Sequence, residues 1–197
     1  MKPILILYAT REGQTEKISR YIAAGLEERG FEVDVFNAAN LSTTIYLGSY
    51  ETAILAASVH IGGHEPELIK FAREHRAELE CMNASFLSVS GAQIGVELST
   101  STPEMRQKGA ADVKMMIDRF VNDTGWQPAR VLPVAGALMY RKYNLLVRFV
   151  MRRIAKKSGG STDTSRNIEY TDWSRLDSFI KELAAEIDAR PILGRAA

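Results

Sequence analysis

Short apolar runs alternate with amphipathic stretches along this chain, and each change of period predicts a new element of secondary structure. Five runs are predicted to be strands: Ile4–Ala9, Phe31–Phe36, Thr52–Val59, Ser85–Ser90 and Arg130–Leu138. Helical periodicity predicts helices near Thr15–Arg29, Glu65–Leu79, Pro103–Asn122 and Trp173–Ala189. Strands joined in this way by helices indicate an α/β fold, a doubly wound parallel sheet with right-handed crossovers.

The composition is typical of a globular domain in a reducing compartment. With 197 residues and 46% hydrophobic content, residues 1–197 can bury one sizeable core, so we expect one domain. The single cysteine, Cys81, excludes an intrachain disulfide. The chain opens directly on a predicted strand, and no apolar run approaches the ~18 residues of a membrane span. We therefore expect a cytoplasmic protein.

The segment between the first strand and the first helix is a candidate phosphate site. It reads Thr10, Arg11, Glu12, Gly13, Gln14, Thr15. The first N–H groups of a helix have no internal partners, and the helix dipole favours an anion there. The alternative is an ordinary turn capped by threonine. The segment has neither GxGxxG nor GxxxxGK[ST]. Its Thr-x-x-Gly-x-Thr spacing resembles the loop with which flavodoxin-like proteins hold the phosphate of FMN, and Arg11 would add a cation there.

Two further segments are expected to join this loop. The resemblance implies a five-stranded sheet in the order 2-1-3-4-5, with the ligand at the carboxyl ends of strands one and three. After strand three come Ser58, Val59, His60, Ile61 and Gly62. After strand four come Ser88, Val89, Ser90, Gly91 and Ala92. Small polar residues suit a flat ring held against backbone, so we predict that these ten residues and Thr10–Thr15 bind FMN.

Two histidines in the second segment invite a different interpretation. His60 and His64 are four residues apart, but the glycines between them predict a loop rather than a helix. Zinc needs three or four ligands, and His75 is predicted to lie about three turns along the next helix, so we expect no metal site. His60 is predicted to donate a hydrogen bond near the flavin or the substrate, or else to be a solvent-exposed loop histidine.

Charge is concentrated in one insertion, about residues 139–167, between the fifth strand and the last helix. Residues 139–166 hold eight of the 25 basic residues and one of the 24 acidic residues, so this segment carries +7 and the rest of the chain −6. Part of it reads as an amphipathic helix whose cations share a face with Phe149. Such a helix can lie on an anionic membrane surface or bind an anionic ligand. A solvated surface helix and nucleic-acid binding are the alternatives, and no nucleic-acid motif supports the latter.

Several motifs together identify a family. They are Ala9–Thr15, Ala57–Val59 with Gly62, Gly125–Pro128, Ala135–Leu138 with Tyr140, Ser158–Thr164, and Tyr170–Trp173. Over nearly its whole length the chain resembles the flavodoxin-like, menaquinone-dependent protoporphyrinogen oxidases of bacteria, and ordinary flavodoxins lack the last blocks. Two departures concern the substrate: His60 stands where that family has arginine, and the segment Gly91–Thr102 is less basic.

The resemblance implies an oxidoreductase of haem biosynthesis that oxidises protoporphyrinogen IX to protoporphyrin IX. It implies FMN as cofactor, a membrane quinone as electron acceptor and peripheral attachment to the cytoplasmic membrane. The flavin N5 would carry the chemistry, in keeping with the absence of a catalytic dyad from the sequence. Arg141, Lys142, Arg148, Phe149 and Arg152 are the expected contacts to the substrate propionates or the membrane. The alternative is a soluble flavodoxin that transfers electrons without a substrate of its own.

Overall fold

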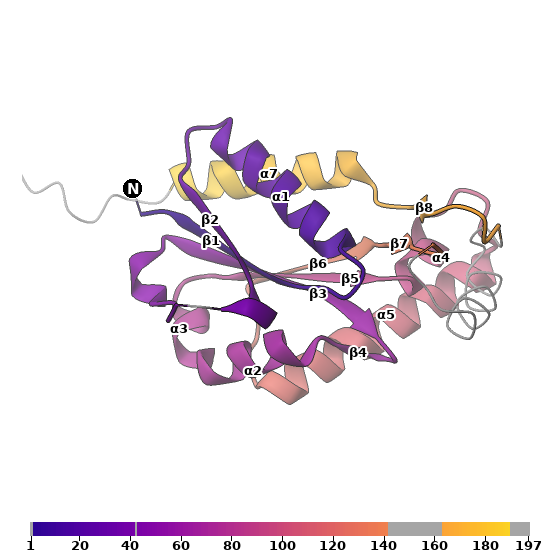
Figure 1. Ribbon diagram of the computed structural model, residues 1–197, viewed down its shortest axis with the longest axis horizontal. Coiled ribbons are helices and arrows are strands. Elements are labelled where there is room, and N and C mark those ends of the chain that lie inside the picture. Colours follow the sequence, from indigo (N-terminus) through magenta and orange to yellow (C-terminus); the bar gives the residue numbers. More distant parts are fainter. Residues whose placement is uncertain (1, 42, 142–162, 190–197) are drawn as a thin grey trace, which may run out of the picture.

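The computed structural model describes residues 2–41, 43–141 and 163–189 (Figure 1). One twisted sheet forms the centre, with helices on both of its faces. The basic helix predicted from the sequence falls on residues 142–157, outside the described part of the chain. Within the described residues no helix is long and apolar enough to cross a membrane.

The sheet confirms the predicted topology. Its parallel strands are β1 (Ile4–Ala9), β2 (Val33–Asn37), β3 (Thr52–His60), β5 (Ser85–Ser90) and β6 (Arg130–Ala135). They follow the order β2-β1-β3-β5-β6, and β4 (Gly63–His64) pairs antiparallel with the end of β3. The inner strand β1 is buried along all six residues, because both of its faces are covered.

The two faces of β1 lead into two halves of the core. Ile4, Ile6 and Tyr8 belong to a cluster with residues of α1 (Gln14–Glu27) and α7 (Trp173–Asp188). Leu5 and Leu7 belong to the opposite cluster, with residues of α2 (Pro66–Glu74), α3 (Arg76–Cys81) and α5 (Pro103–Thr124). Helices α1 and α7 therefore cover one face of the sheet, and α2, α3 and α5 lie on the other (Figure 1).

Four local features differ from the expectation. The helix predicted over 65–79 is split at His75, whose φ of −108° and ψ of 19° are not helical. The loop after strand three is a hairpin formed by β3 and β4. A short helix, α4 (Ala92–Glu97), follows β5, and the fifth strand ends at Ala135. The two 3₁₀ turns between β2 and β3, η1 (Ala38–Asn40) and η2 (Leu47–Ser49), contradict no predicted element.

The ends of the basic insertion are held together beside the sheet. Past Ala135 the chain forms β7 (Ala137–Leu138), which pairs antiparallel with β8 (Ile168–Glu169). Gly136 N–H donates to Ser90 O at 3.2 Å, which fixes the start of this ribbon next to the end of β5. The insertion therefore leaves and re-enters the body at the carboxyl edge of the sheet.

Candidate functional site

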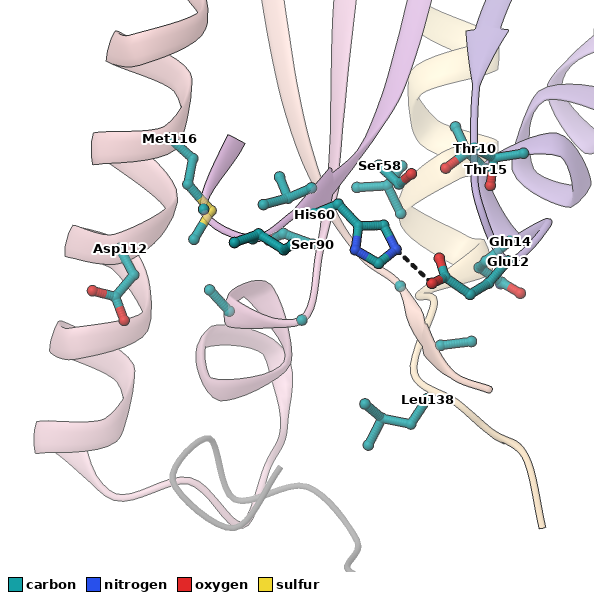
Figure 2. Close-up of a pocket in the computed structure, with 18 residues that line it drawn as sticks. Thr10, Glu12, Gln14, Thr15, Ser58, His60, Ser90, Asp112, Met116 and Leu138 are labelled. Atoms are coloured by element: carbon teal, nitrogen blue, oxygen red, sulfur yellow. Dashed lines mark hydrogen bonds and ion pairs between the residues drawn. The ribbon is translucent and has the colours of Figure 1, made fainter. Parts of the chain in front are cut away.

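A cavity of about 270 Å³ opens at the carboxyl ends of β1, β3, β5 and β6 (Figure 2). This is the edge where the strand order reverses and where ligands of such sheets bind. Thirteen of the sixteen predicted cofactor residues line it: Thr10, Glu12, Gln14, Thr15, Ser58, Val59, His60, Ile61, Gly62, Val89, Ser90, Gly91 and Ala92. The structure thus brings the three predicted segments together around one space, and their role in binding remains a prediction.

Five further residues line the cavity that the sequence did not single out as site residues. Asp112 and Met116 come from α5, and residues 136–138 come from the turn into β7. Close packing brings α5 here, since a Cβ at Gly109 would lie 2.9 Å from Ala92 O of α4. The motif Ala135–Leu138 was one of those on which the family resemblance rests, and it could have been assigned to the site. No local pattern distinguishes Asp112 or Met116 from other residues of a half-exposed helix.

The phosphate loop is shaped by Gly13, the residue before α1. Its φ of 96° lies in the left-handed region, which a residue with a Cβ adopts only with strain. In this conformation Gly13 N–H donates to Thr10 Oγ1 at 3.0 Å. The loop thereby turns sharply into the helix and leaves the first N–H groups of α1 at the cavity, as an anion site requires.

Thr15 provides a direct test of whether a phosphate fits. Its side chain is fully buried, it lines the cavity, and its Oγ1 has no hydrogen-bond partner among the described residues. A buried hydroxyl without a partner costs about 1–3 kcal/mol. A phosphate oxygen at this helix N-terminus would accept its hydrogen bond, so the loop fits the monophosphate end of FMN.

Gln14 ties the loop to the far end of the chain. Its Nε2 donates to Thr171 Oγ1 at 2.9 Å, and Thr171 Oγ1 donates to Ala135 O at 2.8 Å. Both side chains are buried. This chain of hydrogen bonds joins the start of α1, the approach to α7 and the end of β6, and so fixes one wall of the cavity.

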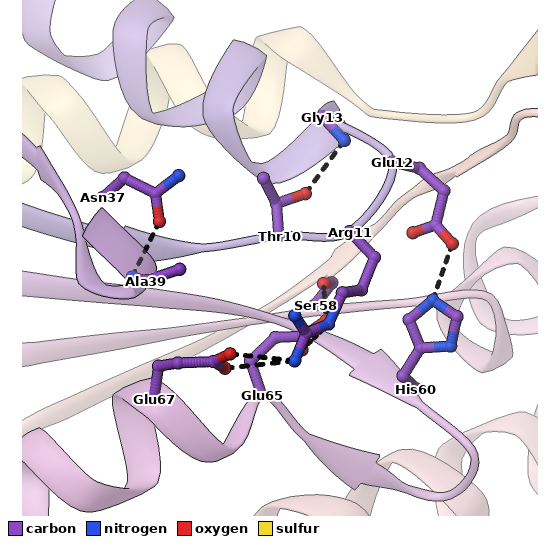
Figure 3. Close-up of polar contacts among 10 residues, drawn as sticks. All are labelled: Thr10, Arg11, Glu12, Gly13, Asn37, Ala39, Ser58, His60, Glu65 and Glu67. Atoms are coloured by element: carbon purple, nitrogen blue, oxygen red, sulfur yellow. Dashed lines mark hydrogen bonds and ion pairs between the residues drawn. The ribbon is translucent and has the colours of Figure 1, made fainter. Parts of the chain in front are cut away.

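Arg11 does not line the cavity. Its Nε lies 2.7 Å from Glu65 Oε2, and its Nη2 lies 3.0 Å from Glu67 Oε1 (Figure 3). Glu65 is only 1% exposed and also accepts a hydrogen bond from Ser58 Oγ at 2.7 Å. The charge of Glu65 is the main cause that raises the pKa of Arg11 above its ordinary value. The guanidinium thus compensates a buried carboxylate in this structure.

His60 and Glu12 meet at the cavity from two different elements. His60 Nε2 lies 2.6 Å from Glu12 Oε1, with the imidazole 39% exposed and the carboxylate side chain 21% exposed (Figure 2). His60 ends β3, and a tight turn follows with positive φ at Ile61 (47°) and Gly62 (76°). The turn leaves Ile61 fully exposed at the cavity rim.

Ser88, a predicted cofactor residue, and its neighbour in space His64 do not line the cavity. His64 Nε2 and Ser88 Oγ are 2.9 Å apart, and both residues are buried. The rings of Phe86 and Phe120 meet the imidazole edge-on at 5.1 and 5.3 Å. Burial lowers the pKa of His64 to about 4, so the ring is neutral near pH 7. Within the described residues no cluster of three or more possible metal ligands occurs. His60 and His64 contact different partners, Glu12 and Ser88 respectively.

The substrate and membrane residues predicted in the insertion are largely beyond the described ranges. Lys142, Arg148, Phe149 and Arg152 lie outside them. Arg141 is described; it is exposed, and its backbone N–H donates to Asn167 Oδ1 at 3.0 Å. Leu138, three positions earlier, lines the cavity. The basic insertion therefore begins next to the cavity mouth.

The charges of the cavity are mainly acidic. Apart from His60, its charged side chains within the described part of the chain are Glu12 and Asp112, and no lysine or arginine lines it there. A phosphate here would be held by hydroxyls and backbone N–H groups rather than by a cation. That is the binding mode expected from the Thr-x-x-Gly-x-Thr spacing.

Comparison with known proteins identifies the family. The flavodoxin domain family matches residues 5–165. Protoporphyrinogen IX dehydrogenase (quinone) of Escherichia coli K12 is 33% identical over 180 residues, which cover 91% of this chain and 93% of that protein. The chain belongs to this family of flavodoxin-domain dehydrogenases. The relative of the same name from Leishmania major is 32% identical over 182 residues, covering 92% of this chain and 74% of that protein.

Membership of this family confirms the resemblance and the oxidoreductase class expected from the sequence, since the curated relatives are dehydrogenases by name. The flavodoxin domain supports a flavin as cofactor. A solved structure supports the fold alone: the C101S mutant of flavodoxin from Pseudomonas aeruginosa is 12% identical, with a TM-score of 0.51 over 95% of this chain and 99% of that one. The predictions of a membrane surface as partner and of membrane attachment remain predictions.

Proposed function

We propose that this protein oxidises protoporphyrinogen IX to protoporphyrin IX, with FMN as cofactor and a membrane quinone (menaquinone or ubiquinone) as electron acceptor. The observation that carries the proposal is the 33% identity with a protoporphyrinogen IX dehydrogenase over 91% of the chain. A flavodoxin fold alone would support a flavin but no particular substrate.

The cavity supports FMN through its phosphate loop. Gly13 turns the chain into α1, and Thr15 offers a buried hydroxyl that has no partner within the described residues. Small residues such as Gly91 and Ala92 let a flat ring approach the backbone, and Val59 offers an apolar contact. When bound, the flavin would supply the hydride-accepting N5 that the chemistry requires. The protein contributes binding, orientation and electrostatics.

The charge of the basic insertion supports the proposals of an anionic substrate and of a membrane contact. It carries +7 against −6 for the rest of the chain, and its first basic residue, Arg141, comes three positions after the cavity-lining Leu138. Cations in this position can bind the propionates of a porphyrinogen at the cavity mouth, a role we assign to Arg141, Lys142, Arg148 and Arg152 as a group. They can also hold the protein, made in the cytoplasm, against an anionic bilayer, where each contributes about 1 kcal/mol. Phe149 would add an apolar contact.

An anaerobic assay of the FMN-loaded protein tests the proposal. Protoporphyrinogen and a menaquinone analogue should together give porphyrin fluorescence, and omission of the quinone should stop it after the bound flavin is reduced. Protein loaded fully with FMN that produces no porphyrin with any quinone would contradict the proposal. That result would favour the alternative, an electron-transfer flavodoxin without a substrate of its own.

A further inference from the structure

Glu12 and His60 form a carboxylate–imidazole pair across the cavity. Glu12 belongs to the loop between β1 and α1, whereas His60 is the last residue of β3. Both line the cavity, and the contact between Oε1 and Nε2 is 2.6 Å (Figures 2 and 3). A contact this short between two separate elements fixes the direction in which the imidazole faces.

The partner of Nε2 determines the tautomer of the ring. An ionised carboxylate can only accept a hydrogen bond, so Nε2 carries the hydrogen of the neutral imidazole. The other nitrogen, Nδ1, then has a lone pair. Nδ1 points away from Glu12, and no hydrogen-bond partner for it is found within the described residues (Figure 2). A proton that arrives at Nδ1 makes an imidazolium whose charge the Glu12 carboxylate stabilises.

The remaining polar groups of the cavity are less suited to take a proton. The hydroxyls of Thr10, Thr15, Ser58 and Ser90 are weak bases. Asp112 also lines the cavity, but its Oδ2 accepts from Lys108 Nζ at 2.7 Å on the surface of α5. The other charged group near the hairpin, Arg119, donates to Gly62 O at 3.3 Å. Within the described lining, the Nδ1 atom of His60 is therefore the group best suited to accept a proton.

Resting on the proposed function, we infer that His60 Nδ1 accepts the proton released when a porphyrinogen is oxidised, and that Glu12 is its positioning residue. Over the three two-electron steps the substrate loses three hydrides from C–H bonds and three protons, two of them from N–H bonds and one from a remaining C–H bond. The bound flavin would supply the hydride acceptor, and Nδ1 takes the proton. Reoxidation by the quinone would take both electrons and two protons: one is the hydrogen that was transferred as hydride, and the other returns from His60, which restores the neutral imidazole.

The tautomer can be measured without turnover. Ring ¹⁵N chemical shifts should be recorded on the FMN-loaded protein, which contains three histidines, with His60→Gln to assign the resonances. We expect the His60 ring to be protonated at Nε2 in the wild-type protein and to become a mixture of tautomers in Glu12→Gln, because an amide can donate as well as accept. A wild-type ring protonated at Nδ1, or shifts that Glu12→Gln leaves unchanged, would overturn the assignment.

Single-turnover reduction of the flavin by protoporphyrinogen, without quinone, tests the role in the reaction. We expect His60→Gln to reduce the rate by about 10²-fold, the lower range for loss of a general base, and to lose the decrease in rate that the wild type shows on acidification. His75→Gln, at the junction of α2 and α3, is the matched control and should behave like the wild type.

The outcomes separate the two claims. A wild-type protein that binds FMN but is not reduced by protoporphyrinogen would overturn the proposed function, and the proton transfer with it. A wild-type protein that is reduced, with an equal rate and an equal pH profile in His60→Gln, would overturn the role of His60 alone. FMN content is measured for every variant, so that loss of the cofactor is not mistaken for loss of the base.

Discussion

Gln14 Nε2 donates a 2.9 Å hydrogen bond to Thr171 Oγ1, although the two residues are 157 positions apart in the chain. Thr171 Oγ1 in turn donates a hydrogen bond to Ala135 O at the end of β6. The loop proposed to hold the phosphate is therefore fixed by the segment that leads into the last helix. The cavity and the C-terminal part of the fold depend on each other.

Thr171→Val should lower the free energy of unfolding by about 2 kcal/mol, because Gln14 Nε2 and Ala135 O each lose a buried partner. The variant should also release FMN faster, since the loop is less firmly held. Urea unfolding and the rate of FMN dissociation are the measurements. Thr171→Ser keeps the hydroxyl and should stay close to the wild type. A stable, tightly binding valine variant would show that this network is dispensable.

Thr15→Val should affect the two forms of the protein in opposite directions. It removes a buried hydroxyl that lacks a partner among the described residues, so the apoprotein should be as stable as the wild type or more stable. If that hydroxyl binds the phosphate, FMN affinity should fall by about tenfold, which corresponds to about 1.4 kcal/mol. Titration of apoprotein with FMN measures this change.

Ser19 offers the matched control for Thr15. Its Oγ is also fully buried and without a partner in the described part of the chain, one turn further along α1, but it does not line the cavity. Ser19→Ala should therefore leave FMN affinity unchanged. Equal affinity losses in the two variants would indicate a general effect on α1 and contradict a specific phosphate contact.

Arg11→Met tests whether this arginine serves the protein or the phosphate. Because Arg11 compensates the buried Glu65 carboxylate, its loss should destabilise the fold by about 1–2 kcal/mol, a value kept small by the partial exposure of the guanidinium. FMN affinity should change by less than a factor of about three. Urea unfolding and FMN titration on the same variant give both numbers. A large loss of affinity with little loss of stability would assign Arg11 to the phosphate, as the sequence suggested.

His64 should make stability depend on pH. Its pKa is about 4 in the folded protein and about 6.5 in the unfolded chain, so between these values the unfolded state binds more protons. The contribution of neutral His64 to the free energy of unfolding is fully present above pH 6.5 and is lost as the pH falls towards 4. At pH 5 the loss relative to pH 7.5 should be about 2 kcal/mol.

His64→Gln provides the comparison for this pH dependence. Unfolding in urea should be measured at pH 7.5 and pH 5 for the wild type and for the variant. The decrease in stability on acidification should be about 2 kcal/mol smaller in His64→Gln, since glutamine does not titrate. Identical decreases in both proteins would mean that His64 is not the group responsible.

Local patterns in the sequence predicted most of the framework. Strands β1 and β5 have the predicted ends, because their apolar runs stop at turn residues that no long-range contact overrides. The split at His75 and the end of β6 at Ala135 were missed. The apolar character of the sequence continues through Leu138, and only the pairing of β7 with β8 shows that the sheet has ended.

The lining of the cavity was predicted where its residues lie close together in sequence, as with Thr10, Glu12, Gln14 and Thr15, and missed where packing brings distant residues in. Asp112 and Met116 reach the cavity because Gly109 lets α5 approach α4, which no local pattern indicates. The direction in which Arg11 points also depended on a distant residue, the buried Glu65. Long-range pairing, rather than the type of each residue, decides these details.

The most direct test of the account is the ratio of quinol to porphyrin formed by the FMN-loaded protein under anaerobic conditions. Conversion of the porphyrinogen to the porphyrin removes six electrons, and each quinone accepts two. The account predicts three quinols for every protoporphyrin, with both products absent from protein stripped of FMN. Quinol formed without porphyrin, or porphyrin formed at the same rate without quinone, would contradict it.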